Sequence, residues 1–242
     1  MRREVDLYQG YTSTSVFVED AESALTPWSV GYFNQFILPH LPVNKDAKIL
    51  DIGCGYGRYV KALCDANYTN VVGIDVSEQQ VSYANSELGL ANVFQQDAFV
   101  MLQDKKNLYD AVLLLDILEH LEVEDSVVLI RLVRESLKDG GVAIIQVPNA
   151  LAPLSPSVWG DITHQRAYTT HSITQSLLLG GFLEPNISHF ELPVYTHSIK
   201  SALRRMMWTL VLKPLFSLFA LSAYGNTMGG IYTVNRLAVA KK

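Results

Sequence analysis

The chain has 242 residues, of which 49% are hydrophobic and 18% are charged, and its formal net charge is −5. This length and composition predict one large domain, with room for an insertion, and exclude a disordered or fibrous protein. A protein that binds the phosphates of nucleic acids needs a basic surface. Because this chain is acidic overall, we expect no nucleic-acid partner.

Three features of the sequence bear on where the protein works. The two cysteines, Cys54 and Cys64, are too few for a disulfide framework and have no metal-type spacing, which favours a reducing compartment. The N-terminal residues lack the apolar segment of a signal peptide. The longest apolar run, residues 206–223, is interrupted by Lys213 and Pro214, so we do not expect it to span a membrane. We therefore expect a cytoplasmic protein, with peripheral membrane contact as an alternative.

From residue 48 onward, short apolar runs alternate with helical stretches. The predicted strands are residues 48–52, 71–74, 93–95, 111–115 and 142–147. The predicted helices are residues 27–41, with Thr26 as N-cap, and residues 58–66, 78–88 and 123–137. This alternation predicts a doubly wound α/β sheet with right-handed crossovers, in which the wholly apolar strand 111–115 is central.

The pattern changes after residue 148. Residues 170–179 predict a helix that ends at Gly180 and Gly181, and residues 186–192 and 232–240 predict two more strands. The segment between these strands, residues 193–230, is too long for an ordinary loop, and we expect it to carry one or two apolar helices. We expect cap or lid helices in residues 1–44, the core in 45–192 and 231–242, and the insertion in 193–230.

A glycine-rich loop follows the first strand, with the sequence DIGCGYG at residues 51–57. Glycines at such a strand-to-helix turn let the backbone bend sharply and let a ligand approach the main chain. The spacing differs from the G-x-G-x-x-G of dinucleotide-binding folds, and no phosphate-binding lysine motif occurs in the chain.

Carboxylates end three successive predicted strands beside this loop: Asp51, Asp75 and Asp97. Asp51 would repel a pyrophosphate but suits an amino group. Asp75 is placed to accept both hydroxyls of a ribose, and Asp97 to accept the amine of an adenine. Together these acids predict a site for a nucleoside that carries an amino acid and no phosphate.

These segments resemble those of class I S-adenosylmethionine-dependent methyltransferases. The matching motifs, in chain order, are ILDIGCGYG at 49–57, VGIDVS at 72–77, QDA at 96–98, YDAV at 109–112 with EHL at 119–121, and the glycines at 140–141. The resemblance covers about residues 45–150 and implies a Rossmann-like sheet of seven strands with the last strand antiparallel. It implies S-adenosylmethionine as cofactor and S-adenosylhomocysteine as product. The residues expected to bind the cofactor are Asp51, Gly53, Gly55, Asp75, Val76, Asp97, Ala98 and Leu115.

An acid and histidine cluster, Asp116, Glu119 and His120, follows the fourth predicted strand. The stretch resembles that of ubiquinone-pathway O-methyltransferases, in which acids and the histidine of this loop are associated with a divalent metal. The resemblance implies that these three residues hold Mg or Mn. A helix-entry loop with acids at the favourable end of the helix dipole is the alternative, and the sequence favours it.

A second cluster lies in the segment WGDITHQRAYT at residues 159–169, soon after the fifth predicted strand. An Asp-x-x-His pair followed by an aromatic residue resembles a segment of methyltransferases from bacterial surface-glycan and polyketide-sugar biosynthesis. Histidine titrates near neutrality and can accept the proton of an alcohol. We therefore expect His164 to act as general base, with Asp161 orienting it. His120 is a further catalytic candidate.

Other residues have more than one interpretation. Tyr8, Tyr11 and Trp28 would form a lid over the site or pack against the first helix. Arg58 would meet the cofactor carboxylate, although a solvated helix surface is favoured for it. Residues 198–225 would serve as a lid, as a homodimer surface or as an interfacial helix on a membrane. The sequence favours the lid or the dimer surface.

Three functions stay open at this point. The first is O-methylation of a small polar acceptor, such as a sugar, a nucleotide-sugar or another glycan precursor, with a histidine base. The second is a metal-assisted O-methyltransferase of a phenolic or quinone-type acceptor. The third is a cofactor-binding subunit without chemistry of its own, which would bind the cofactor but turn over no acceptor.

Overall fold

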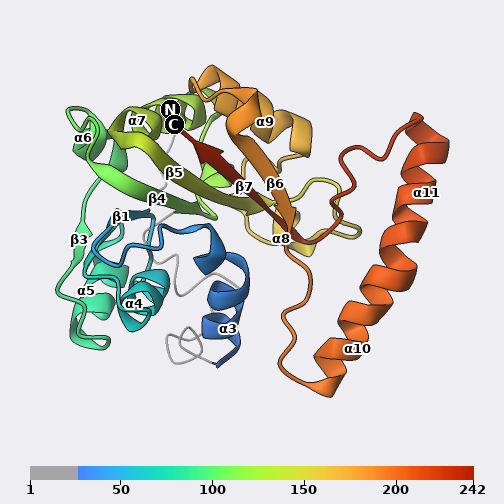
Figure 1. The fold of residues 1–242 in the computed structure, drawn as a ribbon, viewed down its shortest axis with the longest axis horizontal. Coiled ribbons are helices and arrows are strands. Elements are labelled where there is room, and N and C mark those ends of the chain that lie inside the picture. The colour runs from blue at the N-terminus through green and yellow to red at the C-terminus, as the bar shows by residue number, and fades with distance from the viewer. Residues whose placement is uncertain (1–26) are drawn as a thin grey trace, which may run out of the picture.

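A computed structural model of the chain describes residues 27–242 (Figure 1). Tyr8, Tyr11 and Thr26 lie outside the described residues, as does the side chain of Trp28. What was expected of these four residues therefore stays a prediction.

Seven strands form one sheet in the order β3-β2-β1-β4-β5-β7-β6. Their bounds are β1 Lys48–Ile52, β2 Asn70–Asp75, β3 Val93–Gln95, β4 Tyr109–Leu115, β5 Leu137–Pro148, β6 Ile187–Glu191 and β7 Asn235–Lys241. β7 runs antiparallel to both of its neighbours, β5 and β6. The predicted doubly wound seven-stranded sheet with an antiparallel last strand is confirmed.

Helices cover both faces of this sheet (Figure 1). Their bounds are α3 Pro27–Phe36, α4 Arg58–Asp65, α5 Glu78–Ser86, α6 Ala98–Leu102, α7 Val123–Ser136, α8 Pro156–Trp159, α9 Thr170–Leu179, α10 Ile199–Met207 and α11 Lys213–Tyr224. Short 3-10 turns lie at Leu38–His40, Leu118–His120 and Glu184–Asn186. α3, α4 and α5 pack on one face, and α6, α7 and α9 pack on the other.

The central strands divide their side chains between two cores. In β4, Ala111 and Leu113 pack with α3, α4 and α5, whereas Val112 and Leu114 pack with α6, α7 and α9. All four of these side chains are fully buried, as expected for a parallel strand covered on both faces. Because the sheet order reverses between β1 and β4, the carboxyl ends of these two strands open on a crevice where such folds bind ligands.

Three differences from the predicted elements have a clear physical cause. The first helix ends at Phe36 and is followed by a 3-10 turn, because Pro39 cannot donate a backbone bond and its ring clashes with the preceding helical turn. α6 was not predicted, and Asp97 caps its N-terminus. β5 begins at Leu137, since Gly140, with a φ of 77°, lets the strand bulge and continue into Val142.

The insertion is a single helix of 26 residues, Ile199–Tyr224, that projects beside the domain (Figure 1). Lys213 and Pro214, which interrupt the apolar run in the sequence, do not interrupt the helix. A π turn at Trp208–Leu212 joins α10 to α11, and its wider backbone gives the proline ring the space that a regular turn would deny it. The Lys213 ammonium lies 2.8 Å from the Glu191 carboxylate of β6, which neutralises its charge.

Candidate active site

Two adjoining cavities occupy the crevice at the carboxyl ends of the strands. Their volumes are about 450 Å³ and 310 Å³. Both are lined by Gly53, Gly55, Asp116 and His120, so the two spaces meet at the glycine-rich loop. The eight residues expected to bind the cofactor all line one or both of them: Asp51, Gly53, Gly55, Asp75, Val76, Asp97, Ala98 and Leu115. None of the residues 199–224 lines either cavity.

At two positions the conformation of the glycine-rich loop requires a glycine. Gly53 and Gly55 have φ angles of 66° and 56°, in the left-handed region that favours glycine. A Cβ atom on Gly53 would lie 1.9 Å from Cδ1 of Ile117, so an alanine there would force the Ile117 side chain to move. The Gly55 N–H donates to Oδ2 of Asp75 at 2.8 Å. The backbone of the loop therefore forms part of the cavity wall directly.

Asp51 is a buried acid without a full set of partners. Its side chain is 1% exposed, and its Oδ2 atom accepts no hydrogen bond from residues 27–242. Burial raises the pKa of Asp51 to about 8, against the opposing effect of the Arg58 guanidinium, and the Asp75 carboxylate raises it further. A buried carboxyl group with an oxygen that lacks a donor favours a cationic ligand group. An ammonium would supply that donor and stabilise the ionised form of the acid.

The ligand-free protein is expected to lose about 1 kcal/mol of stability through Asp51 between about pH 7 and pH 8.5. In the unfolded chain Asp51 is already ionised, with a usual pKa of 3.8, whereas in the fold it keeps its proton up to about pH 8. The folded state therefore binds more protons, and its stability falls as the pH rises through this window. Asp51→Asn should flatten the fall measured by denaturant unfolding. The exposed Asp104, changed to Asn, is the matched control; equal slopes in wild type and Asp51→Asn would contradict this assignment.

The other two acids are held by backbone N–H groups. Asp75 accepts from Gly55 through Oδ2 and from Ser77 through Oδ1, each at 2.8 Å. Oδ1 of Asp97 accepts from the N–H groups of Phe99 and Val100 at 2.7 and 3.1 Å. Both carboxylates line the smaller cavity with fixed orientation.

A polar relay that the sequence did not reveal reaches the larger cavity. Tyr32 donates from its hydroxyl to Oε1 of Gln146 at 2.8 Å, and Nε2 of Gln146 donates to Oδ2 of Asp116 at 2.7 Å. Asp116 has a φ of 59° without being glycine, a strained conformation of the kind that occurs at functional sites. A glutamine inside the apolar run 142–147 is the signal that could have found this relay. Arg58, for which a solvated surface was favoured, lines the larger cavity.

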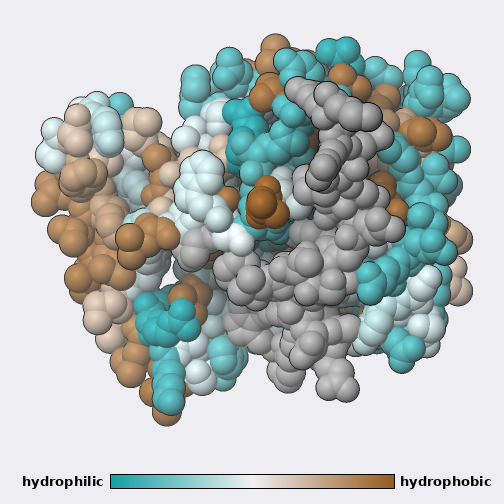
Figure 2. Space-filling model, turned by 180° about the vertical axis from the view of Figure 1, so that it is seen from behind, coloured by the Kyte–Doolittle hydropathy of each residue, from teal (hydrophilic) through white to brown (hydrophobic). Residues whose placement is uncertain are grey.

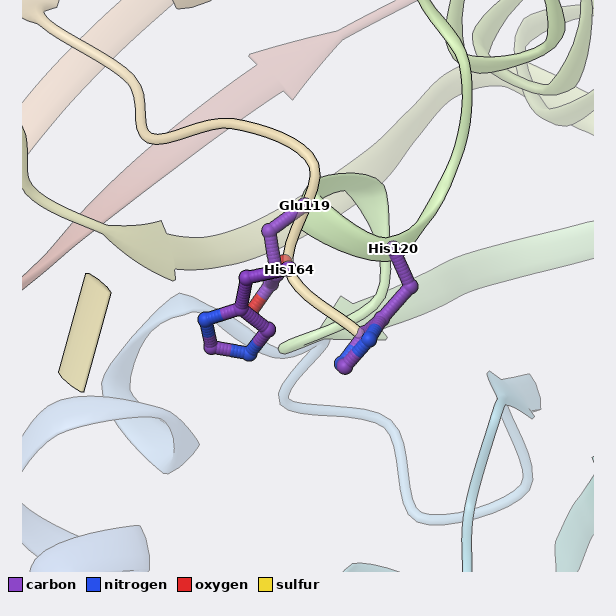
Figure 3. Close-up of side chains that lie close together, drawn as sticks. All are labelled: Glu119, His120 and His164. Atoms are coloured by element: carbon purple, nitrogen blue, oxygen red, sulfur yellow. The ribbon is translucent and has the colours of Figure 1, made fainter. Parts of the chain in front are cut away.

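The two loops that carry the alternative catalytic clusters meet in the structure (Figure 3). Glu119 and His120, from the turn after β4, and His164, from the loop before α9, offer ligand atoms that lie within 4.8 Å of one another. The two imidazole rings are 4.6 Å apart between centroids, edge to face. Neither carboxylate oxygen of the buried Glu119 has a hydrogen-bond partner among the described residues. Burial raises the pKa of Glu119 well above its usual range, and the nearby Asp116 carboxylate raises it further.

Hydrogen bonds fix the ring nitrogens of both histidines. The Thr163 hydroxyl donates to Oδ1 of Asp161 at 2.7 Å and so accepts from Nδ1 of His120 at 2.8 Å. Nδ1 of His164 lies 3.3 Å from the Val158 carbonyl oxygen, which can only accept, so Nδ1 carries the proton. In each ring the lone pair is therefore on Nε2. Burial lowers the pKa of His120 to about 4, with His164 adding to the effect, so His120 is neutral at physiological pH.

Parts of this chain are similar to a known protein family and to characterised proteins. The profile of a family described as "Methyltransferase domain" matches residues 32–206. A ubiquinone biosynthesis O-methyltransferase of Rickettsia canadensis is 30% identical over 130 residues, which cover 52% of this chain and 53% of that protein. The 27-O-demethylrifamycin SV methyltransferase of Amycolatopsis mediterranei is 34% identical over 95 residues, covering 39% and 32%. The chain thus spans about half the length of the first relative and a third of the second.

The fold has close neighbours among solved structures. The crystal structure of an S-adenosylmethionine-dependent methyltransferase from Archaeoglobus fulgidus superposes with a TM-score of 0.63. The two sequences are 19% identical, and the alignment covers 88% of this chain and 93% of the other. At this identity the likeness concerns the fold.

Proposed function

Because the chain belongs to the methyltransferase domain family, we propose that it transfers a methyl group from S-adenosylmethionine to an oxygen of a small polar acceptor. The observation that carries the proposal is the position of His164. Its imidazole has the lone pair on Nε2 and lines the larger cavity, which the glycine-rich loop shares with the smaller one. Relatives named as O-methyltransferases support an oxygen as the acceptor atom.

The residues of the two cavities suit this cofactor. Asp51, with its orphaned buried oxygen, would hold the ammonium group, and Asp75 would hold the ribose hydroxyls. Asp97, with Val76 and Ala98, would line the adenine site. When bound, S-adenosylmethionine supplies a methyl group on a sulfonium, and transfer to the acceptor leaves S-adenosylhomocysteine.

The chain's own residues have two tasks in this proposal. His164 accepts at Nε2 the proton that the acceptor hydroxyl loses as its oxygen is methylated. The loops around residues 116–120 and 157–164 enclose the acceptor and align it, which a direct displacement requires. Asp161 acts through Thr163 on His120, which stays neutral and can hydrogen-bond the acceptor.

The chemistry of the larger cavity favours a polar acceptor such as a sugar or a nucleotide-sugar. Gln146, Ser157 and Asn235 line it together with the acids, and such groups match the hydroxyls of a carbohydrate. The cysteines of the described residues, Cys54 and Cys64, are both free, which suits a cytoplasmic location.

A panel of acceptors tests the proposal through the formation of S-adenosylhomocysteine. Turnover with sugars or nucleotide-sugars, and none with phenols, is the expected result. Turnover with phenols alone would instead support an O-methyltransferase of a phenolic or quinone-type acceptor. Binding of S-adenosylhomocysteine without turnover of any acceptor would leave the non-catalytic subunit.

A metal-assisted reaction is the second candidate, and the cluster of Glu119, His120 and His164 favours it specifically. The donor set of one carboxylate and two imidazoles suits Mn better than Mg, and a cation would satisfy the two orphaned oxygens of Glu119. The predicted set had Asp116 in place of His164. Asp116 lines the same cavity, and its Oδ1 has no partner among residues 27–242.

Chelation separates the two candidates. For a metal-free His164 base, treatment with EDTA is expected to leave the rate unchanged within about twofold. For the metal-assisted enzyme, EDTA should remove activity and Mn should restore it. Calorimetric titration of Mn into the EDTA-treated protein gives an independent readout, and Glu119→Gln should weaken any binding about 10-fold or more.

A further inference from the structure

The helix Ile199–Tyr224 exposes its apolar side chains to an unusual degree. By length and composition it could cross a membrane, yet only 6% of its most apolar window of 18 residues is buried in the structure. A core helix of similar composition would be mostly buried. Figure 2 shows the apolar side chains gathered along this projecting part of the molecule, at the left of the view. The match to the methyltransferase family also ends within α10, at residue 206.

The exposed apolar residues are arranged for contact with lipid. In α10 and the π turn they recur three and four residues apart, so they form one face: Ile199, Leu203, Met206, Met207 and Leu210. In α11 they cover a wider arc, about 160° at 3.6 residues per turn: Leu215, Leu218, Phe219 and Leu221, each more than half exposed. A second helix packed along one side would leave part of this second set in water. Lipid acyl chains, which adapt to the surface that they cover, can bury this wider arc of a helix that lies at the membrane boundary.

The charges of the helix complement an anionic surface. Its charged residues are Lys200, Arg204, Arg205 and Lys213, of which Lys213 is paired with Glu191, and it contains no acid, although the whole chain has a net charge of −5. Lys200 and Arg204 are exposed and adjoin the apolar face of α10. Long basic side chains in this position reach lipid phosphates while their helix lies at the boundary of the acyl chains.

The topology decides how the helix meets the membrane. It leaves the sheet after Glu191 and returns at Asn235, and Glu191 pairs with Arg236 in the antiparallel β6–β7 ladder. The helix is about 39 Å long at 1.5 Å per residue. If it spanned a bilayer, its ends would lie on opposite sides, and a connecting segment would have to cross back through the hydrocarbon to a neighbouring strand. Unpaired backbone does not do this, so the helix must lie flat.

We propose that Ile199–Tyr224 docks the protein on the surface of an anionic lipid bilayer, with its axis parallel to the membrane plane. The contact places the domain, with its cavities, at the bilayer surface. It is independent of the reaction proposed above.

Flotation of the full chain with preformed vesicles tests this contact. Vesicles of seven parts phosphatidylcholine and three parts phosphatidylglycerol should carry the protein up the gradient, and pure phosphatidylcholine should carry clearly less. Leu218→Glu combined with Phe219→Glu should reduce binding about tenfold or more. Lys200→Gln combined with Arg204→Gln should reduce binding to the anionic vesicles and weaken its dependence on salt. Val43→Glu, at an exposed apolar position in the loop before β1, is the matched control and should bind normally.

The oligomeric state supplies the competing outcome. Light scattering of the wild type and of Leu218→Glu with Phe219→Glu shows whether the helix joins two copies. If the wild type is a dimer that these substitutions dissociate, and it does not float with vesicles, the proposal is overturned in favour of a second copy. Failure of a monomeric wild type to float with anionic vesicles overturns it as well. Binding of S-adenosylhomocysteine by each variant confirms that the variant is folded.

Discussion

The Asp75→Ala variant is expected to bind S-adenosylhomocysteine about 100-fold more weakly than the wild type, or worse. The Asp75 carboxylate is held by the N–H groups of Gly55 and Ser77 and faces the smaller cavity. In the proposed site it accepts two hydrogen bonds from the ribose, and hydrogen bonds to a charged group contribute about 1.5–3 kcal/mol each. Loss of both corresponds to a factor of at least about 100 in the dissociation constant.

Calorimetric titration at neutral pH measures this difference. Asp104→Asn, on the exposed turn after α6, should bind as the wild type does. Asp75→Asn should fall between the wild type and Asp75→Ala, since an amide keeps one acceptor. Melting curves establish that each variant is folded. A folded Asp75→Ala protein with wild-type affinity would sink the assignment of the smaller cavity to the nucleoside.

The His164→Gln variant is expected to lose about 10²–10⁴-fold in kcat while binding S-adenosylhomocysteine within about threefold of the wild type. Glutamine keeps a hydrogen-bonding group near the Val158 carbonyl but cannot take a proton from the acceptor. The equivalent change at His120 should cost much less, because a histidine with a pKa of about 4 is a weak base at neutral pH.

Rates for His164→Gln and His120→Gln, measured with an acceptor found in the panel, distinguish the mechanisms. A large loss at position 164 alone supports the base. Equal large losses at both positions, accompanied by loss of Mn binding, would show that the two rings act as ligands. Full activity of His164→Gln would remove this residue from the chemistry.

The cofactor region could be predicted from the sequence because its residues are local to strand ends. Asp51 lies near the end of one predicted strand, Asp75 and Asp97 follow the next two, and the carboxyl ends of parallel strands meet at one edge of a sheet. The order of the strands and helices was therefore enough to predict that the three carboxylates lie close together. The capping role of Asp97 could not be predicted, because the short helix α6 that it caps was not predicted.

The acceptor region could not be predicted in the same way. Glu119 and His164 are far apart in the sequence, and the path of the chain between β5 and α9 brings them together. The bond from Thr163 to His120 depends on that path, and so does the relay from Tyr32 through Gln146 to Asp116. Whether the insertion holds one helix or two could not be predicted either, because the sequence does not reveal the π turn that precedes Pro214 in the continuous helix.

The register between Glu191 and Arg236 has a consequence for how this chain can diverge. The segment that carries the long helix leaves from β6 and returns to β7. These two strands are already paired with each other, so the sheet forms without any contribution from the helix. Closing a longer or shorter connection between paired strand ends changes the loop entropy only slowly with length. The segment can therefore be lengthened, trimmed or exchanged between relatives while the sheet and both cavities keep their form. Changes in the β6–β7 connection can thus alter the surface that the protein contacts, while changes in the loops at the strand ends alter the cavities. The two kinds of change are separate.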